Sequence, residues 1–169
     1  MLGSYVIILN YLEEKLFVAI KRDNLPLCKE LIDVAVNAGC DAVKLQKRDI
    51  DQVYTQEMLN SPRESPWGST QREQKVGLEF NLEEYIEIDR YCKENKIDWF
   101  ASAWDTNSQE FLQQFDCKYN KVASAMLTNI ELLKTIAEEK KHTFIGTGMS
   151  TIDEIREAVR EAAVVELGP

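Results

Sequence analysis

Two long polar side chains, Lys44 and Gln46, interrupt the run DAVKLQ, which otherwise has the apolar composition of a short buried strand. Alternate residues of a strand point to opposite sides, so these two side chains, two positions apart, point to the same side. A buried lysine without a partner is costly. Either Lys44 reaches solvent at the end of its strand, or it serves a site that needs a positive charge. We favour the second interpretation.

Polar residues also collect at the ends of three later strand-like runs, WFASAW, YNKVASAM and HTFIGTGM. Parallel α/β folds place their sites at the edge where the carboxyl ends of the strands meet. Lysines from two strands, with hydroxyls and backbone amides beside them, form a cradle suited to a phosphate or a carboxylate. The residues that we predict to line this anion site are Lys44, Gln46, Ser102, Lys121, Ser124 and Thr147.

Carboxylates and the single histidine are weaker candidates for catalysis. Asp105, Glu73 and Glu79 are the carboxylates nearest the expected mouth of the site, but such residues more often cap helices or remain solvated. His142 begins the last strand-like run, at the end away from the site, and we interpret it as structural. A metal site built on two or three histidines cannot be assembled from this chain alone.

The elements that would position these residues alternate between short strands and amphipathic helices. This order predicts an α/β fold with a parallel sheet and right-handed crossovers. Apolar residues at helical spacing and capping signals predict helices over residues 81–96, 107–116, 128–141 and 150–166. Asn81 and Asn129 are candidate N-caps. The last helix begins with Thr151 as its cap and Glu154 in the capping-box position or, as a weaker match, with Ser150 as its cap.

Residues 47–80 form a long polar connection that contains the segment SPRESPWG. A connection of this length is usually functional when it is ordered. Trp67 and the mixed charges predict an ordered excursion over the top of the sheet; the alternative is a peripheral insertion.

The composition excludes several classes of protein. The chain has 169 residues, 44% of them hydrophobic, which is typical of one globular domain. Its net charge is −9 and its basic residues are scattered, which disfavours nucleic acid as a partner. No apolar run approaches the roughly 20 residues that cross a bilayer, and no signal peptide is recognisable, so we expect a cytoplasmic protein without a membrane partner. The four cysteines contain no CxxC pair and are expected to be reduced and structural.

Several segments, taken together, resemble the sialic acid synthase family, the N-acetylneuraminate synthases and their relatives that act on similar nine-carbon sugars. In chain order they are VKLQKRD, the connection with SPWG, WFASAWD, YNKVASAMLTN and FIGTGMST. The resemblance covers roughly residues 25–160. It implies that residues 25–169 are a partial (β/α)8 TIM barrel with about the first five βα units, normally followed by further strands and a small antifreeze-like domain.

The resemblance also implies an activity and roles for particular residues. The family condenses phosphoenolpyruvate with N-acetylmannosamine, releases phosphate, uses a divalent metal (Mn or Mg), and is expected to act as a homodimer in its full-length form. By this resemblance, Lys121 and Ser124 contact the phosphate and carboxylate of phosphoenolpyruvate, and Lys44 and Gln46 line the same pocket. Fixed lysines would stabilise the charge that develops on the phosphate and on an alkoxide.

The sequence departs from the family pattern in three places. The family's first strand ends in E-I-G-x-N-H-N-G, which provides a catalytic glutamate, but the equivalent stretch here reads LFVAIKRDNLP. Glu13 and Glu14 lie too early unless the alignment is gapped, so residues 1–24 are expected to be an atypical segment. Gly146 stands where relatives usually carry serine. The two metal-binding histidines belong to later strands, so we expect no metal ligand in this chain.

Three functions are therefore open. The first is a synthase of N-acetylneuraminate in sialic acid and surface polysaccharide (lipopolysaccharide or capsule) biosynthesis. The second is a non-catalytic, truncated or degenerate relative that keeps an anion-binding half-site. The third is another aldolase-type barrel enzyme, such as a legionaminic or pseudaminic acid synthase. An incomplete barrel would expose a sheet edge and apolar helix faces, so the chain is expected to aggregate or to pair with another chain.

Overall fold

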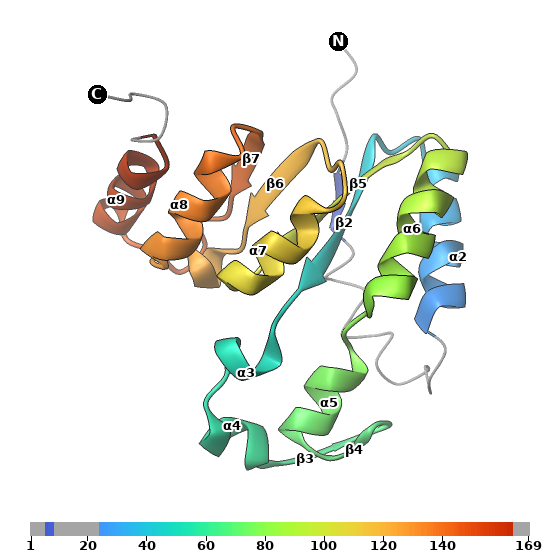
Figure 1. Cartoon of the computed structure of the whole chain (residues 1–169), viewed down its shortest axis with the longest axis horizontal. Helices are drawn as coiled ribbons and strands as arrows, with labels where there is room; N and C mark the ends of the chain where they lie inside the picture. The colour runs from blue at the N-terminus through green and yellow to red at the C-terminus, as the bar shows by residue number, and fades with distance from the viewer. Residues whose placement is uncertain (1–5, 9–23, 164–169) are drawn as a thin grey trace. The chain divides into compact units, whose positions relative to one another are not determined.

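The computed structural model describes residues 6–8 and 24–163 of the chain (Figure 1). Residues 9–23 lie outside this part, so Glu13 and Glu14 are not placed, and of residues 1–24 only β1 and Asn24 are described. The elements in chain order are β1 (Val6–Ile8), α2 (Asn24–Asn37), β2 (Ala42–Lys47), α3 (Ile50–Val53), α4 (Gln56–Asn60), β3 (Pro62–Ser65), β4 (Gly68–Thr70), α5 (Gln71–Gly77), α6 (Leu82–Glu94), β5 (Asp98–Ala103), α7 (Thr106–Gln113), β6 (Tyr119–Val122), the 3-10 helix η1 (Ser124–Met126), α8 (Ile130–Glu138), β7 (His142–Ile145) and α9 (Ile152–Ala163).

The chain divides into two compact units, and strands β2 and β5 contribute to both. The first unit contains residues 1–45 and 50–99, and the second contains residues 46–49 and 100–169. Strands β1 and β2 pair in parallel, as do β5, β6 and β7, which confirms the predicted α/β class with a parallel sheet; the β3–β4 pair of the connection is antiparallel. None of the described helices is long and apolar enough to cross a bilayer.

In the first unit, helices α2 and α6 lie side by side (Figure 1). Lys29 of α2 forms an ion pair with Glu87 of α6, and the Tyr91 hydroxyl donates to Asp33 Oδ1 at 2.8 Å. The core of this unit is apolar and aromatic; its fully buried side chains include Ile32, Leu59, Tyr85, Ile88 and Cys92. The charged contacts therefore lie at the edge of a helix pair that is held mainly by burial of apolar surface.

Helix α6 begins as its sequence predicts. Asn81 Oδ1 accepts a hydrogen bond from the Glu84 amide at 2.9 Å, and the Glu84 carboxylate accepts one from the Asn81 amide at 2.8 Å. This reciprocal capping box satisfies two amides that the first turn of a helix leaves without partners. The N-cap prediction for Asn81 is confirmed.

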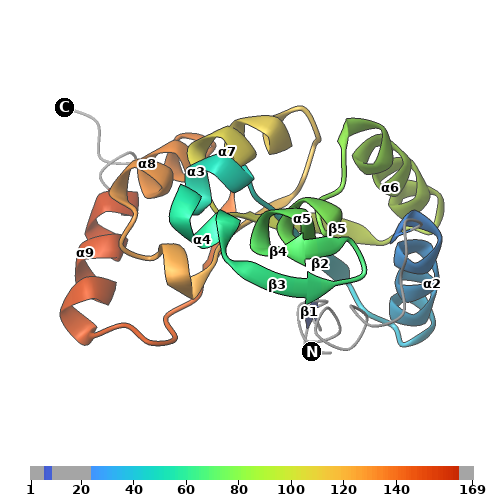
Figure 2. The same cartoon turned by 90° about the horizontal axis from the view of Figure 1, so that it is seen from below.

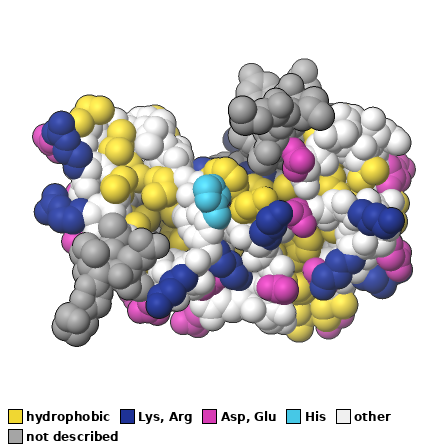
Figure 3. All heavy atoms as spheres, turned by 90° about the horizontal axis from the view of Figure 1, so that it is seen from above, with side chains coloured by type: hydrophobic (Ala, Val, Ile, Leu, Met, Phe, Trp, Pro, Cys, Tyr) yellow, Lys and Arg dark blue, Asp and Glu magenta, His cyan; other side chains and the backbone are white. Residues whose placement is uncertain are grey.

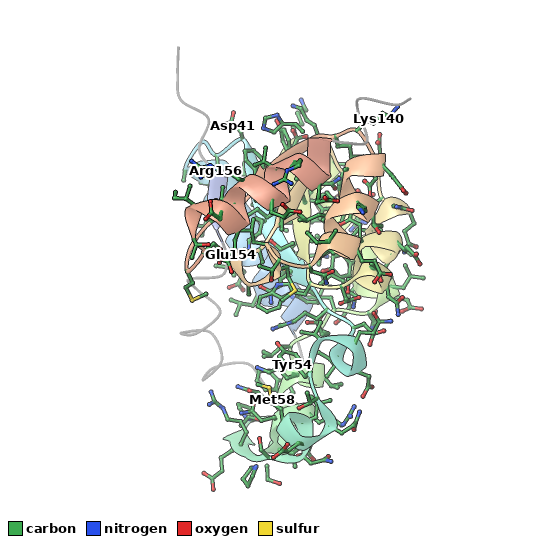
Figure 4. The ribbon with its side chains drawn as sticks, turned by 90° about the vertical axis from the view of Figure 1, so that its left-hand side faces the viewer. Asp41, Tyr54, Met58, Lys140, Glu154 and Arg156 are labelled. Atoms are coloured by element: carbon green, nitrogen blue, oxygen red, sulfur yellow. The ribbon has the colours of Figure 1, made fainter. Side chains whose placement is uncertain are left out.

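The long connection is folded, as predicted, into α3, α4, the β3–β4 hairpin and α5 (Figure 2). Gly68 has a φ of 149°, and a Cβ there would lie 2.3 Å from the Glu73 carboxylate, so the turn requires glycine. The Trp67 ring packs directly on Gly77 of α5, where a Cβ would lie 2.1 Å from the indole. Tyr54 also belongs to this segment (Figure 4) and stacks with the ammonium of Lys75, 5.0 Å from the ring centroid. The predicted location of the whole connection over the top of the sheet stays a prediction.

In the second unit, β5, β6 and β7 lie side by side in that order. Ser102 is opposite Lys121, and Lys121 is opposite Phe144. The two sides of β6 differ, because Asn120 and Val122 are buried while Tyr119 and Lys121 are half-buried. Because side chains alternate along a strand, one side of β6 is covered by helices and the other carries Lys121, the predicted site residue.

Helices α8 and α9 begin at the predicted caps. Asn129 Oδ1 accepts from the Leu132 amide at 3.1 Å. For α9, the Glu154 amide donates to Thr151 Oγ1 at 3.3 Å and the Thr151 amide donates to Glu154 Oε2 at 2.6 Å. This pair confirms Thr151, and not Ser150, as the cap. Glu154 and Arg156 project from α9 into solvent (Figure 4).

Candidate anion-binding site

Lys121 is the centre of the candidate site in the second unit. Its ammonium donates to the carbonyl oxygen of Val122, with Nζ 2.7 Å from that oxygen. The side chain is half-buried, and burial lowers the pKa of Lys121 below its ordinary value. Hydrogen bonding to one carbonyl leaves two of the three ammonium donors for other acceptors.

The turn that follows β7 meets Lys121 at the same carbonyl. The Gly146 amide also donates to Val122 O, at 2.9 Å. A Cβ on Gly146 would lie 2.9 Å from Lys121 Nζ and 3.0 Å from the Ser124 amide nitrogen. A Cβ on Gly148 would lie 3.6 Å from Ser124 Oγ. The structure thus brings Lys121, Ser124 and the turn that includes Thr147 together.

Ser124 is presented by a 3-10 helix and not by the strand itself. The run YNKVASAM forms a strand only over Tyr119–Val122, and Ser124 opens η1. The first residues of a helix have amides without intrahelical partners, and the amide of Ser124 lies beside the lysine. Ser124 therefore offers both a hydroxyl and an amide to the site.

For the other predicted residues, the structure gives less direct information on how near they lie to Lys121. Ser102 is 2% exposed and lies opposite Lys121 in the parallel register. Gln46 is half-buried in the same unit, and Thr147 is exposed in the turn after β7. Lys44 belongs to the first unit, so its convergence with Lys121 stays a prediction.

Lys44 is nevertheless not a lysine at a fraying strand end. It lies opposite Ile8 of β1 and is only 2% exposed. An ammonium buried to this degree does not reach solvent along its stem, which removes the more ordinary of the two explanations. A partner or a site that uses the charge is required.

Asp105 has a structural role at the start of α7. Its Oδ1 accepts from the Ser108 amide at 2.7 Å, and its Oδ2 accepts from the Ser108 hydroxyl at 2.7 Å and from the Asp49 amide at 2.8 Å. Three donors on a residue that is 4% exposed define an N-cap that also holds the end of β2. The sequence predicts this helix over residues 107–116 and indicates neither Asp105 as its cap nor the contact with Asp49.

Glu73 and His142 make local contacts of their own. Glu73 accepts from the Thr70 hydroxyl and from the amides of Ser69 and Thr70, and these bonds lower the pKa of Glu73. His142 is exposed at the start of β7, with its ring 4.9 Å from that of Phe144. Figure 3 shows the histidine, in cyan, at the surface beside hydrophobic side chains.

A buried polar network on the other side of β6 has no counterpart among the predicted residues. Gln109 Nε2 donates to Glu139 Oε1 at 2.5 Å and to Asn120 Oδ1 at 3.3 Å. Asn120 Nδ2 donates to Glu139 Oε2 at 3.2 Å, and Lys141 forms an ion pair with the same oxygen. The network fixes the side of β6 opposite Lys121. The one feature of the sequence that indicates this network is Asn120, a polar residue inside the strand-like run YNKVASAM.

The described residues do not fit a metal site. Within the part of the chain that the structure describes, no three His, Cys, Asp or Glu side chains come together to hold an ion. All four cysteines are free thiols, and Cys28, Cys92 and Cys117 are buried, as a structural role requires. The ion that the family resemblance implies therefore has no ligand set among these described residues.

The class of protein follows from comparison with solved structures. The N-acetylneuraminic acid (sialic acid) synthetase of Leptospira borgpetersenii serovar Hardjo-bovis matches with a TM-score of 0.72 at 21% identity. The match covers 85% of this chain and 46% of that chain. The chain is thus an α/β protein whose strands and helices form part of a TIM barrel, as the sequence predicts.

The family follows from sequence. The model of the NeuB family matches residues 31–166, and the chain belongs to this family. The N-acetylneuraminate-9-phosphate synthase of Drosophila melanogaster is 35% identical over 134 residues, which are 78% of this chain and 36% of that protein. The N,N'-diacetyllegionaminic acid synthase of Legionella pneumophila is 30% identical over 139 residues, 80% of this chain and 39% of that protein. The chain therefore spans well under half the length of these relatives.

Proposed function

We propose that this chain supplies part of the substrate site of a sugar acid synthase, which condenses phosphoenolpyruvate with N-acetylmannosamine or a related amino sugar and releases phosphate. Membership of the NeuB family and the activities for which its relatives are named support this proposal. The observation that carries it is the convergence of Lys121, Ser124 and the Gly146 turn at the end of β6.

The donors in this group suit an anion with several oxygens. Lys121 contributes a positive charge held at one position, and Ser124 contributes an amide and a hydroxyl within reach of it. In the proposed reaction, water adds to C2 of phosphoenolpyruvate, C3 forms a bond to the aldehyde carbon of the sugar, and phosphate leaves. Donors that are already in place stabilise the negative charge on the phosphate and carboxylate without reorganising.

Burial of Lys121 links anion binding to protonation. The pKa of Lys121 is lowered by burial, which disfavours the charged form. A bound phosphate or carboxylate would favour the charged form and raise this pKa again. Binding should therefore be accompanied by proton uptake at alkaline pH, near the pKa of the free lysine.

The acceptor sugar is the second part of the proposal. The relatives are named for different products: a neuraminate 9-phosphate, a diacetyllegionaminic acid and a pseudaminic acid. We propose an N-acetylated amino sugar as acceptor. Phosphate release should be measured with N-acetylmannosamine, its phosphate ester and the diacetamido sugars, with and without added Mn. Binding of phosphoenolpyruvate without release for any acceptor would assign the chain an anion-binding role only.

The binding test compares Lys121 with Lys118, which is three residues away in the sequence but has different surroundings. Lys118 is exposed and stacks over the Tyr119 ring at 5.1 Å, whereas Lys121 lies in the candidate site. A hydrogen bond to a charged group contributes about 1.5–3 kcal/mol, so Lys121→Ala should weaken phosphoenolpyruvate binding roughly ten- to hundredfold. Lys118→Ala should leave the calorimetric Kd unchanged. Equal affinity in the wild type and both variants would contradict the placement of the site.

A further inference from the structure

Gly146 leaves open a space that the end of the Lys121 side chain occupies. A Cβ at residue 146 would lie 2.9 Å from Lys121 Nζ, closer than real Cβ atoms approach another heavy atom. The backbone of this position is part of the same contact, because the Gly146 amide and the Lys121 ammonium donate to one acceptor, Val122 O. A side chain at residue 146 would therefore force the end of the Lys121 side chain, or the turn itself, to shift.

We propose that Gly146 and the Val122 carbonyl form a seat that fixes the Lys121 ammonium, so that Gly146 is a positioning residue that determines where the charge of the anion site lies. This inference rests on the proposed function, which it deepens. A lysine side chain has four rotatable bonds, and ordering it on binding costs affinity unless it is ordered beforehand. The seat performs that ordering before the ligand arrives.

The lysine in this seat is also partly buried, which lowers its pKa. Burial is the cause of the lowered pKa of Lys121, and a side chain released into water would lose that effect. Occupancy of the seat can therefore be measured without any ligand.

Gly148 offers a matched control in the same turn. A Cβ there would lie 3.6 Å from Ser124 Oγ and 3.7 Å from Ser124 Cβ, which are ordinary van der Waals distances. Gly148→Ala therefore adds the same methyl group, with the same loss of chain flexibility, two residues away and without contact with the lysine. Differences between Gly146→Ala and Gly148→Ala report on the seat.

The experiment is an NMR titration of lysine side chains labelled with carbon-13 at Cε, combined with calorimetric binding of inorganic phosphate. In the wild type and in Gly148→Ala, Lys121 should titrate below the ordinary lysine value. In Gly146→Ala the pKa of Lys121 should shift back toward the ordinary lysine value, and phosphate binding should weaken roughly three- to tenfold. An unchanged Lys121 pKa in folded Gly146→Ala overturns the proposal.

Two further outcomes keep the tests separate. If Gly146→Ala does not fold, as judged by circular dichroism, the wild-type titration decides, and an ordinary pKa for Lys121 overturns the seat. If the wild type binds neither phosphate nor phosphoenolpyruvate, the proposed function fails. The titration still supports the seat when Lys121 responds to Gly146→Ala and not to Gly148→Ala.

Discussion

Asp105 offers a quantitative test of whether the carboxylate that caps α7 stabilises the fold. Replacing Asp105 with alanine removes one helix cap, which contributes about 1 kcal/mol. It also leaves the Asp49 amide and the Ser108 hydroxyl without their acceptor, and each such donor costs about 1–3 kcal/mol when fully buried. Ser108 is buried but Asp49 is only half-buried, so we expect a total loss of about 2–4 kcal/mol in the free energy of unfolding.

The measurement is urea denaturation of three variants followed by circular dichroism. Asp105→Asn keeps an acceptor for the Ser108 amide and should lose about half as much as Asp105→Ala. Asn129→Ala removes a cap with one hydrogen bond in the same unit, and should cost only about 1 kcal/mol. If Asp105→Ala costs no more than Asn129→Ala, the three hydrogen bonds assigned to Asp105 do not stabilise the fold as described.

Three further predictions concern pH, thiols and association. Burial alone would raise the pKa of Glu139, but hydrogen bonds from Gln109, Lys141 and Asn120 hold it below its ordinary value, so its stabilising contribution is present above about pH 4.3 and lost as pH falls through the lower folded pKa. Glu139→Gln should flatten that part of the acid unfolding curve, and an unchanged curve would contradict the network. Burial, followed by the charge of Glu84, raises the pKa of the Cys28 thiol to about 12, so a thiol reagent at pH 8 should label half-buried Cys40 first; faster labelling of Cys28 would contradict its burial. Exposed Ile152 and Val159 on α9 should promote self-association, which Ile152→Glu with Val159→Lys should reduce in size-exclusion chromatography; a monodisperse wild-type monomer would contradict this.

The sequence predicts the repeating architecture well because local signals determine it. The helices begin at Asn81, Asn129 and Thr151 because the side-chain oxygen of each is the acceptor that the first turn needs. The strand ends are less well predicted, since Ala123 and Ser124 look strand-like in composition but the chain turns into η1 there. The two sides of β6 are distinguished by the alternation of its side chains and not by its amino-acid composition.

The candidate site is only partly visible in the sequence. Side-chain chemistry at strand ends predicts Lys121 and Ser124 as site residues, but the acceptor that holds the ammonium is the backbone carbonyl of Val122, which side-chain types do not indicate. Gly146 is conspicuous in the sequence only as a missing serine. Its effect on the lysine depends on the distance between residue 146 and Lys121 Nζ, which only the folded structure shows.

Calorimetric binding of phosphoenolpyruvate to the wild type and to Lys121→Ala would show whether Lys121 holds the anion in the proposed site. We expect measurable binding by the wild type, at least tenfold weaker binding by Lys121→Ala, and wild-type affinity in Lys118→Ala. Binding that is unaffected by Lys121→Ala would contradict this expectation.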